Sequence, residues 1–201
     1  MNKTKIYALL SGVFCSCLII SNILAFKTFT ILNITLPAAV IVFPIVYITN
    51  DILSEVYGYN NTRIVIILGF IMNLVAVLSY NIAIMLPYNE YFTGQESFEL
   101  VLSNSGRILV ASLIAYLIGG LLNAKIMEHM KKYSRLYERC IVSTFVGESV
   151  DAFIFVTIAF IGKMPPSAIL ILIINQAMFK TIYEIICYPI TKLAIKKISN
   201  V

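Results

Sequence analysis

Long apolar runs separated by short polar stretches account for most of the chain. Each run is about 20 residues or longer, the length that an α-helix needs to cross the hydrocarbon core of a bilayer. The pattern therefore predicts an all-α fold, with residues 1–201 forming a single transmembrane transporter domain of six helices. The expected spans are Ile6–Phe26, Pro37–Tyr57, Arg63–Leu86, Gly106–Met127, Ile141–Ile161 and Ser167–Ile190.

Composition and charge support this picture and orient it. Hydrophobic residues make up 60% of the 201 residues and charged residues 12%, whereas soluble domains carry about 25% charged residues. Eleven of the lysines and arginines fall on one side of the predicted membrane, while the other side holds Lys27 and Lys163. The positive-inside bias predicts that both termini are cytoplasmic. The net charge of +5 therefore gives no indication of nucleic-acid binding.

Acidic residues recur in the middle helix of each half of the chain. The expected second span carries Asp51 and Glu55, and the expected fifth carries Glu148 and Asp151. Three helices in each half, with the amino terminus inside, would insert the two halves in opposite senses. Secondary transporters often have such inverted repeats, with the binding site at the interface between them. We therefore consider two inverted three-helix halves.

The segment Phe43–Tyr59, FPIVYITNDILSEVYGY, has the clearest polar face. Tyr47, Asp51 and Glu55 are spaced four residues apart and would point the same way on a helix. A carboxylate at the centre of a membrane costs about 2.5–3.5 kcal/mol, so a pair of them indicates a polar path or binding site. The alternative is that this face is the water-exposed end of a helix, which remains open for Glu55.

The last two spans add further charge. Lys180 can pair with Glu184 on its own helix or with an acid on a neighbouring helix. Five expected intramembrane carboxylates face Lys180 and, at a helix mouth, Arg107. Unpaired buried carboxylates take up protons or bind a cationic ligand, which suits a transporter, here with proton coupling, better than a structural ion network. The polar faces comprise Thr144, Glu148 and Asp151, and Gln176, Lys180 and Glu184.

Other chemistries have less support. The chain has one histidine, His129, in a basic loop, and no HExxH or glycine-rich phosphate loop, so we expect no enzyme and no ATPase. The four cysteines form no CxxC motif, so we expect no metal site, cofactor or disulfide. Gly119 and Gly120 could pack helices together within the chain or against a second copy, and on that basis we expect a homodimer.

Several motifs together resemble one family, the VUT family of bacterial queuosine-precursor transporters, also called the YhhQ family. They span about Ser21 to Pro189: Ser21-Asn22, FPIVYITNDILSEVYGY, Arg107 with Ala111-Ser112 and Tyr116, STFVGESVDAFIFVTIAF at Ser143–Phe160, and Phe179-Lys180 with Pro189. Many members carry Gln where this chain has Gly120, which could alter substrate preference. The resemblance implies an inner-membrane protein that takes up a deazaguanine base, either the cyano or aminomethyl precursor or queuine itself, for tRNA queuosine modification. Two modes stay open: a secondary carrier, or the substrate-binding subunit of an energy-coupling-factor importer for a small heterocycle.

A purine-like base suits the polar residues of these spans. Carboxylates and amides can bind the donors on its edge, and aromatic rings can stack on its faces. The candidate substrate-binding residues are Asn22, Phe43, Tyr47, Asp51, Glu55, Arg107, Ser112, Tyr116, Glu148, Asp151, Gln176 and Lys180.

Overall fold

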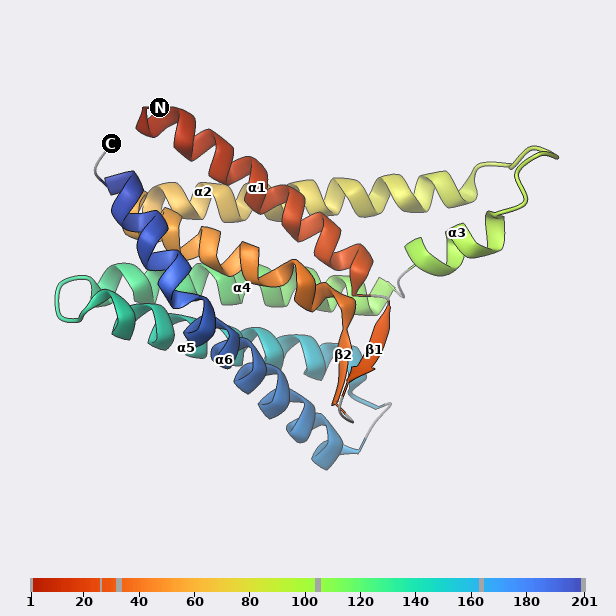
Figure 1. The fold of residues 1–201 in the computed structure, drawn as a ribbon. Helices are drawn as coiled ribbons and strands as arrows, with labels where there is room; N and C mark the ends of the chain where they lie inside the picture. The colour runs from red at the N-terminus through yellow and green to blue at the C-terminus, as the bar shows by residue number, and fades with distance from the viewer. Residues whose placement is uncertain (1, 26, 32–33, 104–105, 163–164, 200–201) are drawn as a thin grey trace.

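The computed structural model describes residues 2–25, 27–31, 34–103, 106–162 and 165–199, which form a helical bundle with one small hairpin (Figure 1). Its helices are α1 (Lys3–Leu24), α2 (Phe43–Met85), α3 (Gln95–Leu102), α4 (Gly106–Met130), α5 (Leu136–Phe160) and α6 (Pro166–Ser199). The antiparallel strands β1 (Thr28–Ile31) and β2 (Ile34–Pro37) and the 3₁₀ helix Ala38–Ile41 connect α1 to α2.

Five helices, α1, α2, α4, α5 and α6, are long and apolar enough to cross a membrane. Large apolar side chains cover much of their outer surface, Ile64, Ile82 and Ile186 among them, as expected where the solvent is lipid. The chain is therefore a multi-pass membrane protein. The sequence predicted six separate spans, and the difference lies in α2, which includes both the second and the third.

A break at Gly58 divides α2 into two halves. Gly58 has φ 79° and ψ 167°, a backbone region that is essentially restricted to glycine. The orange first half and the yellow second half run in opposite directions (Figure 1). Side-chain hydroxyls fix both flanks of the turn near the start of α1: Tyr57 donates to the carbonyl of Lys3, and Tyr7 donates to that of Asn61.

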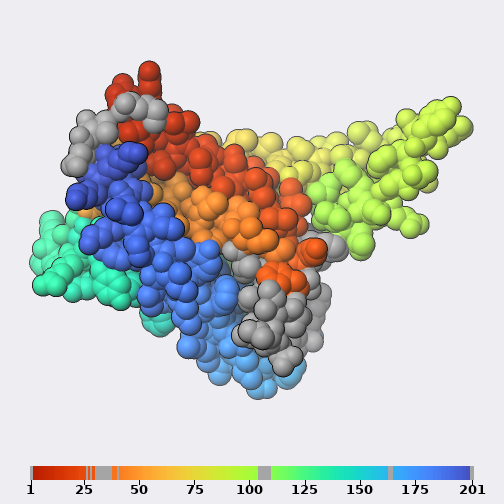
Figure 2. Space-filling view, viewed as in Figure 1, coloured from red at the N-terminus to blue at the C-terminus, as the bar shows by residue number. Residues whose placement is uncertain are grey.

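Three connecting regions differ from the sequence prediction. Residues 27–36, expected as a loop, include most of the β1–β2 hairpin, whose Thr28-Phe29-Thr30-Ile31 strand is rich in residues that favour β-structure. The polar connector Pro87–Ser105 contains α3, and the chain around α3 projects from the bundle (Figure 2). Helix α6 continues past Pro189 into the basic tail, where lysines favour helix.

Helices α4 and α5 approach closely through two glycines. A Cβ atom on Gly119 would lie 2.9 Å from the carbonyl oxygen of Gly147, and one on Gly147 would lie 2.8 Å from the Cβ of Asn123. Gly119 is therefore used inside the chain, whereas the sequence analysis used it as a reason to expect a second copy. The homodimer stays a prediction, without the support of this residue.

Candidate functional site

Lys180 of α6 lies at the centre of the bundle between charged and aromatic partners. Its Nζ atom is 2.5 Å from Oε2 of Glu148 and 2.7 Å from Oδ2 of Asp151, both on α5. The same atom lies 5.2 Å from the ring centroid of Phe43 and 5.7 Å from that of Tyr47, both on α2. Three helices thus converge on one cation, held by two carboxylates and two ring faces.

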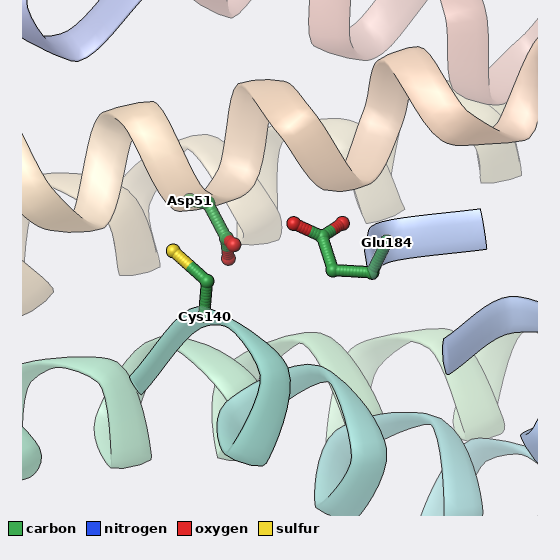
Figure 3. A group of neighbouring side chains, drawn as sticks. All are labelled: Asp51, Cys140 and Glu184. Atoms are coloured by element: carbon green, nitrogen blue, oxygen red, sulfur yellow. The ribbon is translucent and has the colours of Figure 1, made fainter. Parts of the chain in front are cut away.

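These contacts decide which acid pairs with Lys180. The sequence left open Glu184 on the same helix and an acid on a neighbouring helix. The neighbouring acids are correct, and the pairing with Glu184 is wrong, because Glu184 points to a different group of side chains (Figure 3). Glu148 and Asp151 lie three residues apart and share one face of α5, so they can contact the same ammonium group.

A small central cavity adjoins this group. Its volume is about 20 Å³, and its lining includes Tyr47, Asn50, Asn123, Glu148 and Asp151, together with the rings of Phe14, Phe43 and Tyr116. Asn50 Oδ1 and both polar side-chain atoms of Asn123 are buried and make no hydrogen bond to the described residues. Buried polar atoms normally have partners, so these amides are available to a ligand. A cavity of this size holds about one water molecule, so the site is contracted in this conformation.

A second, larger cavity of about 320 Å³ is lined by residues of α1, α2, α3, α4 and α5. Its polar lining residues are Asn22, Asn73, Asn81 and Ser112, with Tyr80, and Phe155 and Phe160 are among its apolar ones. Ser112 lies one helical turn before Tyr116, which lines the central cavity. This volume falls within the range of small-molecule sites, about 300–1,000 Å³.

The Phe14 and Tyr116 rings pack together where the two cavities approach. Their centroids are 6.2 Å apart, and the Tyr116 hydroxyl donates to the carbonyl of Ile66. Both side chains lie against Gly69, where an added Cβ would be 3.0 Å from Cε1 of Phe14 and 3.0 Å from the hydroxyl oxygen of Tyr116. The two rings therefore form a packed wall of the central cavity on the side of Ser112 and the larger cavity.

An ion pair closes the opposite end of the bundle. Arg139 of α5 donates from Nη2 and Nε to the two carboxylate oxygens of Glu55, at 2.5 and 3.0 Å. Its Nη1 binds the carbonyl of Ser134, and Lys131 donates to the main-chain carbonyl of Glu55. The sequence analysis placed Arg139 in a loop. Helix α5 begins at Leu136 instead, so the arginine belongs to the helix and reaches α2.

Asp51 faces away from the central cavity, toward Cys140 of α5 and Glu184 of α6 (Figure 3). One ligand atom from each side chain lies within 4.8 Å of the other two. No sequence feature placed Cys140 in a site, because it belongs to no CxxC motif. Nothing in its spacing could have indicated that α5 brings it to two acids from other helices.

The candidate residues from the sequence therefore separate into groups. Phe43, Tyr47, Tyr116, Glu148, Asp151 and Lys180 gather at the centre, whereas Asn22 and Ser112 line the larger cavity. Gln176 is half-buried one turn before Lys180, and the side chain of Arg107 lies outside the described part of the chain. Asp51 and Glu55 belong to the two groups described above. Their roles in substrate binding stay predictions. Reasoning from the sequence missed Asn50 and Asn123, two amides within apolar helices.

Comparisons with known proteins agree on one class. A family model described as "Putative vitamin uptake transporter" matches residues 37–194. The chain is similar to a "Probable queuosine precursor transporter" of Bacillus subtilis, 23% identical over 184 residues that cover 90% of this chain and 80% of the relative. It is also similar to a protein of the same description from Haemophilus influenzae, 27% identical over 127 residues, or 62% and 52% of the two chains. No solved structure matches.

Proposed function

The chain belongs to this vitamin uptake transporter family, and from that premise we propose that it carries a queuosine precursor, a deazaguanine base or queuine, across the bacterial inner membrane as a secondary carrier. The central cavity is the observation that carries the proposal. Asn50, Asn123 and the two acids of α5 offer hydrogen-bond acceptors and donors to a base edge, and Tyr47 is among the rings that could cover its face. The two relatives named above as queuosine precursor transporters support the substrate class.

We assign the larger cavity to the external side and the Glu55–Arg139 pair to the cytoplasmic side. The distribution of lysine and arginine supports this orientation, because Arg139 belongs to the most basic part of the chain. Both termini would then be cytoplasmic. In this scheme the larger cavity lies on the external side of the Phe14 and Tyr116 rings, and the Glu55–Arg139 pair joins α2 to α5 on the cytoplasmic side.

The same scheme gives six crossings, because the two halves of α2 would each cross the membrane. The first half, Phe43–Tyr57, is only about 22 Å long at 1.5 Å per residue, shorter than a hydrocarbon core of about 30 Å. The 3₁₀ helix and the hairpin before it would complete that crossing. Many secondary transporters hold their binding sites between inverted halves. The helices that would be equivalent are the first half of α2 and α5, each carrying acids.

Uptake by the purified chain tests the proposal. Proteoliposomes containing this chain alone should accumulate labelled queuine above protein-free liposomes, and unlabelled deazaguanine bases should compete while an unrelated pyrimidine should not. Uptake without other subunits would also exclude dependence on an energy-coupling-factor ATPase. Calorimetry on the same preparation separates binding from transport. If the purified chain neither takes up nor binds any deazaguanine base, the proposed substrate is wrong.

A further inference from the structure

Asp51 and Glu184 are two acids that the central cavity does not use, and they lie beside each other in the interior. Asp51 is fully buried, Glu184 is 2% exposed, and Cys140, at the edge of the pair, is fully buried. Neither oxygen of Asp51 nor Oε1 of Glu184 has a hydrogen-bond partner among the described residues. Figure 3 shows the two carboxyl groups pointing into the same space, with the thiol of Cys140 next to Asp51.

The cations nearest to this pair in the chain are already engaged. Arg139 binds Glu55, one turn along α2 from Asp51, and Lys180 binds Glu148 and Asp151, one turn along α6 from Glu184. Helices α1 and α4 pack on α2, and the charged side chains described on them, Lys3, Lys5, Lys125, Glu128 and His129, are exposed. The titratable and charged groups around the pair are Tyr47 and Glu55 on α2, Arg139, Cys140 and Glu148 on α5, and Lys180 on α6, with exposed Lys3 and Lys5 on α1 and exposed Lys125, Glu128 and His129 on α4.

We propose that Asp51 and Glu184 form a proton-binding site, in which one carboxyl group donates a hydrogen bond to the other across the interface of α2 and α6. Two ionised carboxylates without a counter-ion are strongly disfavoured in a buried, low-dielectric position. A shared proton supplies the missing donor and lowers the buried charge by one. This site is separate from the central cavity that we assign to the substrate.

A proton fits the geometry better than a metal ion. Calcium takes six to eight oxygen ligands, and structural zinc sites take four ligands, usually nitrogen and sulfur. The group found among the described residues offers one ligand atom from each of three side chains. Cys140 as a neutral thiol can hydrogen-bond weakly to a carboxylate, which requires no metal. The pair of carboxyl groups alone is sufficient for a proton.

The position of the pair would couple its proton to transport, a step that rests on the proposed function. Deprotonation releases one proton to water and leaves both carboxylates charged near Arg139. In the structure this arginine binds Glu55 and the main-chain carbonyl of Ser134. The guanidinium can then be drawn from Glu55 toward Asp51, one turn away on α2, which would open the closed end. Reprotonation restores the neutral donor and the Glu55–Arg139 pair.

Infrared difference spectroscopy on the purified protein tests the proton site without any substrate. The wild-type protein at neutral pH should show the C=O stretch of a protonated carboxyl group, and alkaline pH should convert it to carboxylate bands. Asp51→Asn and Glu184→Gln should each shift this band, because the remaining carboxyl group loses its carboxylate partner, and the double variant should remove it. The matched change Glu128→Gln on the surface of α4 should leave the band unchanged. A wild-type spectrum with no protonated carboxyl band, or a band that survives both substitutions in folded protein, would overturn the proposal.

A metal arm distinguishes the other occupant. Cobalt(II) added to the wild-type protein should produce no thiolate-to-metal absorption. A stoichiometric band that Cys140→Ser removes would identify a metal site and overturn the proton assignment. In proteoliposomes, a proton gradient directed inward, with the outside more acidic, should increase queuine accumulation several-fold in the wild type and in Glu128→Gln. It should not do so in Asp51→Asn. If neither the wild type nor any variant transports queuine, the proposed substrate is wrong. The infrared result decides the proton site independently of that outcome.

Discussion

At the scale of single residues, Lys180 organises the centre of the molecule. Its ammonium group neutralises one of its two acids and leaves a net negative charge beside the central cavity. The ring faces of Phe43 and Tyr47 add a weaker attraction to the same cation. The site can therefore hold acceptors ready for a base while keeping its charges partly satisfied in an apolar interior.

Glu148→Gln tests the contribution of an acceptor to substrate binding. The amide keeps the side-chain volume but replaces one acceptor with a donor, and Lys180 retains Asp151, so the fold should persist. A charge-assisted hydrogen bond contributes about 1.5–3 kcal/mol. The affinity for queuine, measured by calorimetry, should therefore fall roughly tenfold to a hundredfold. Glu96→Gln on exposed α3 should bind as the wild type does. Equal affinity in Glu148→Gln would place the base elsewhere.

Lys180→Met tests the ion network. The substitution removes the cation and leaves Glu148 and Asp151 facing each other, which typically costs about 3–5 kcal/mol for a dry pair. Partial exposure of Lys180 and Asp151, 18% and 17% of their side chains, places the expected loss at the lower end. Thermal unfolding in detergent measures this loss of stability, and Lys192→Met, at an exposed lysine of α6, is the matched control. The double change with Glu148→Gln should recover part of the loss, and wild-type melting of Lys180→Met would refute the network.

At the scale of helices, glycines determine how the elements meet in two places, one a chain reversal and the other a close approach. Gly58 permits the reversal inside α2, so that both halves of this helix pack beside α1. Gly119 and Gly147 allow α4 and α5 to come within backbone contact, which places Asp151 at the centre. Both features set the position of the site without contributing a functional group to it.

Gly58→Ala tests the reversal. An alanine at φ 79° and ψ 167° carries a strain of about 1–3 kcal/mol, so the melting temperature should fall. Gly12→Ala is the matched control, since an added Cβ there meets nothing within 4 Å and a helical glycine gains from alanine. Equal stability of Gly58→Ala and the wild type would mean that the two halves of α2 can join without this backbone conformation.

Gly119→Ala tests the contact between α4 and α5. The added methyl group would lie 2.9 Å from Cβ of Asp151 and from the carbonyl oxygen of Gly147, and such overpacking costs about 1–3 kcal/mol. We expect a lower melting temperature and weaker queuine binding, because Asp151 must move. Gly120→Ala, whose Cβ would lie at an ordinary 3.7 Å from Ile66, should leave stability unchanged. Similar melting of both variants would contradict close packing here.

At the scale of the whole molecule, the two ends of the bundle differ, because one holds the larger cavity and the other holds the Glu55–Arg139 ion pair. The larger cavity, the Phe14 and Tyr116 rings, the central site and the Glu55–Arg139 pair follow one another through the bundle. We propose that the rings and the ion pair open at different times during transport. The lysine and arginine distribution supports an orientation with the ion pair toward the cytoplasm.

Site-directed thiol labelling tests that orientation. In a background without the native cysteines, Gly94→Cys should react in intact cells with a reagent that cannot cross the membrane, because the chain around α3 would lie outside. Tyr133→Cys, in the loop between α4 and α5 where Tyr133 is 80% exposed, should react only after permeabilisation. The reverse pattern would invert the proposed orientation, and with it the assignment of the two cavities.

The amino-acid sequence alone predicted the membrane environment, the helical fold and the family. Six of its candidate residues lie together at the centre of the bundle, and their role in binding stays a prediction. Helical spacing placed Glu148 and Asp151 on one face of the fifth span, and both contact Lys180 in the structure. Tyr47, on the polar face of the second span, lies against the same cation. The reversal at Gly58 lies in the polar stretch 58–62 between the predicted second and third spans, whereas the hairpin at residues 28–37 and helix α3 were not predicted. The early start of α5 likewise hid Arg139 within a basic stretch that reads as a loop.

What the sequence determined by itself is local: which segments are apolar enough for lipid, and which polar residues share one face of a helix. The tertiary structure decided which faces meet. Tyr47, Asp51 and Glu55 share a helical stripe, yet they reach the Lys180 group, Cys140 with Glu184, and Arg139 respectively. Helices α5 and α6 meet that stripe at different heights. Partners from other helices depend on packing, which the spacing along one chain segment does not encode.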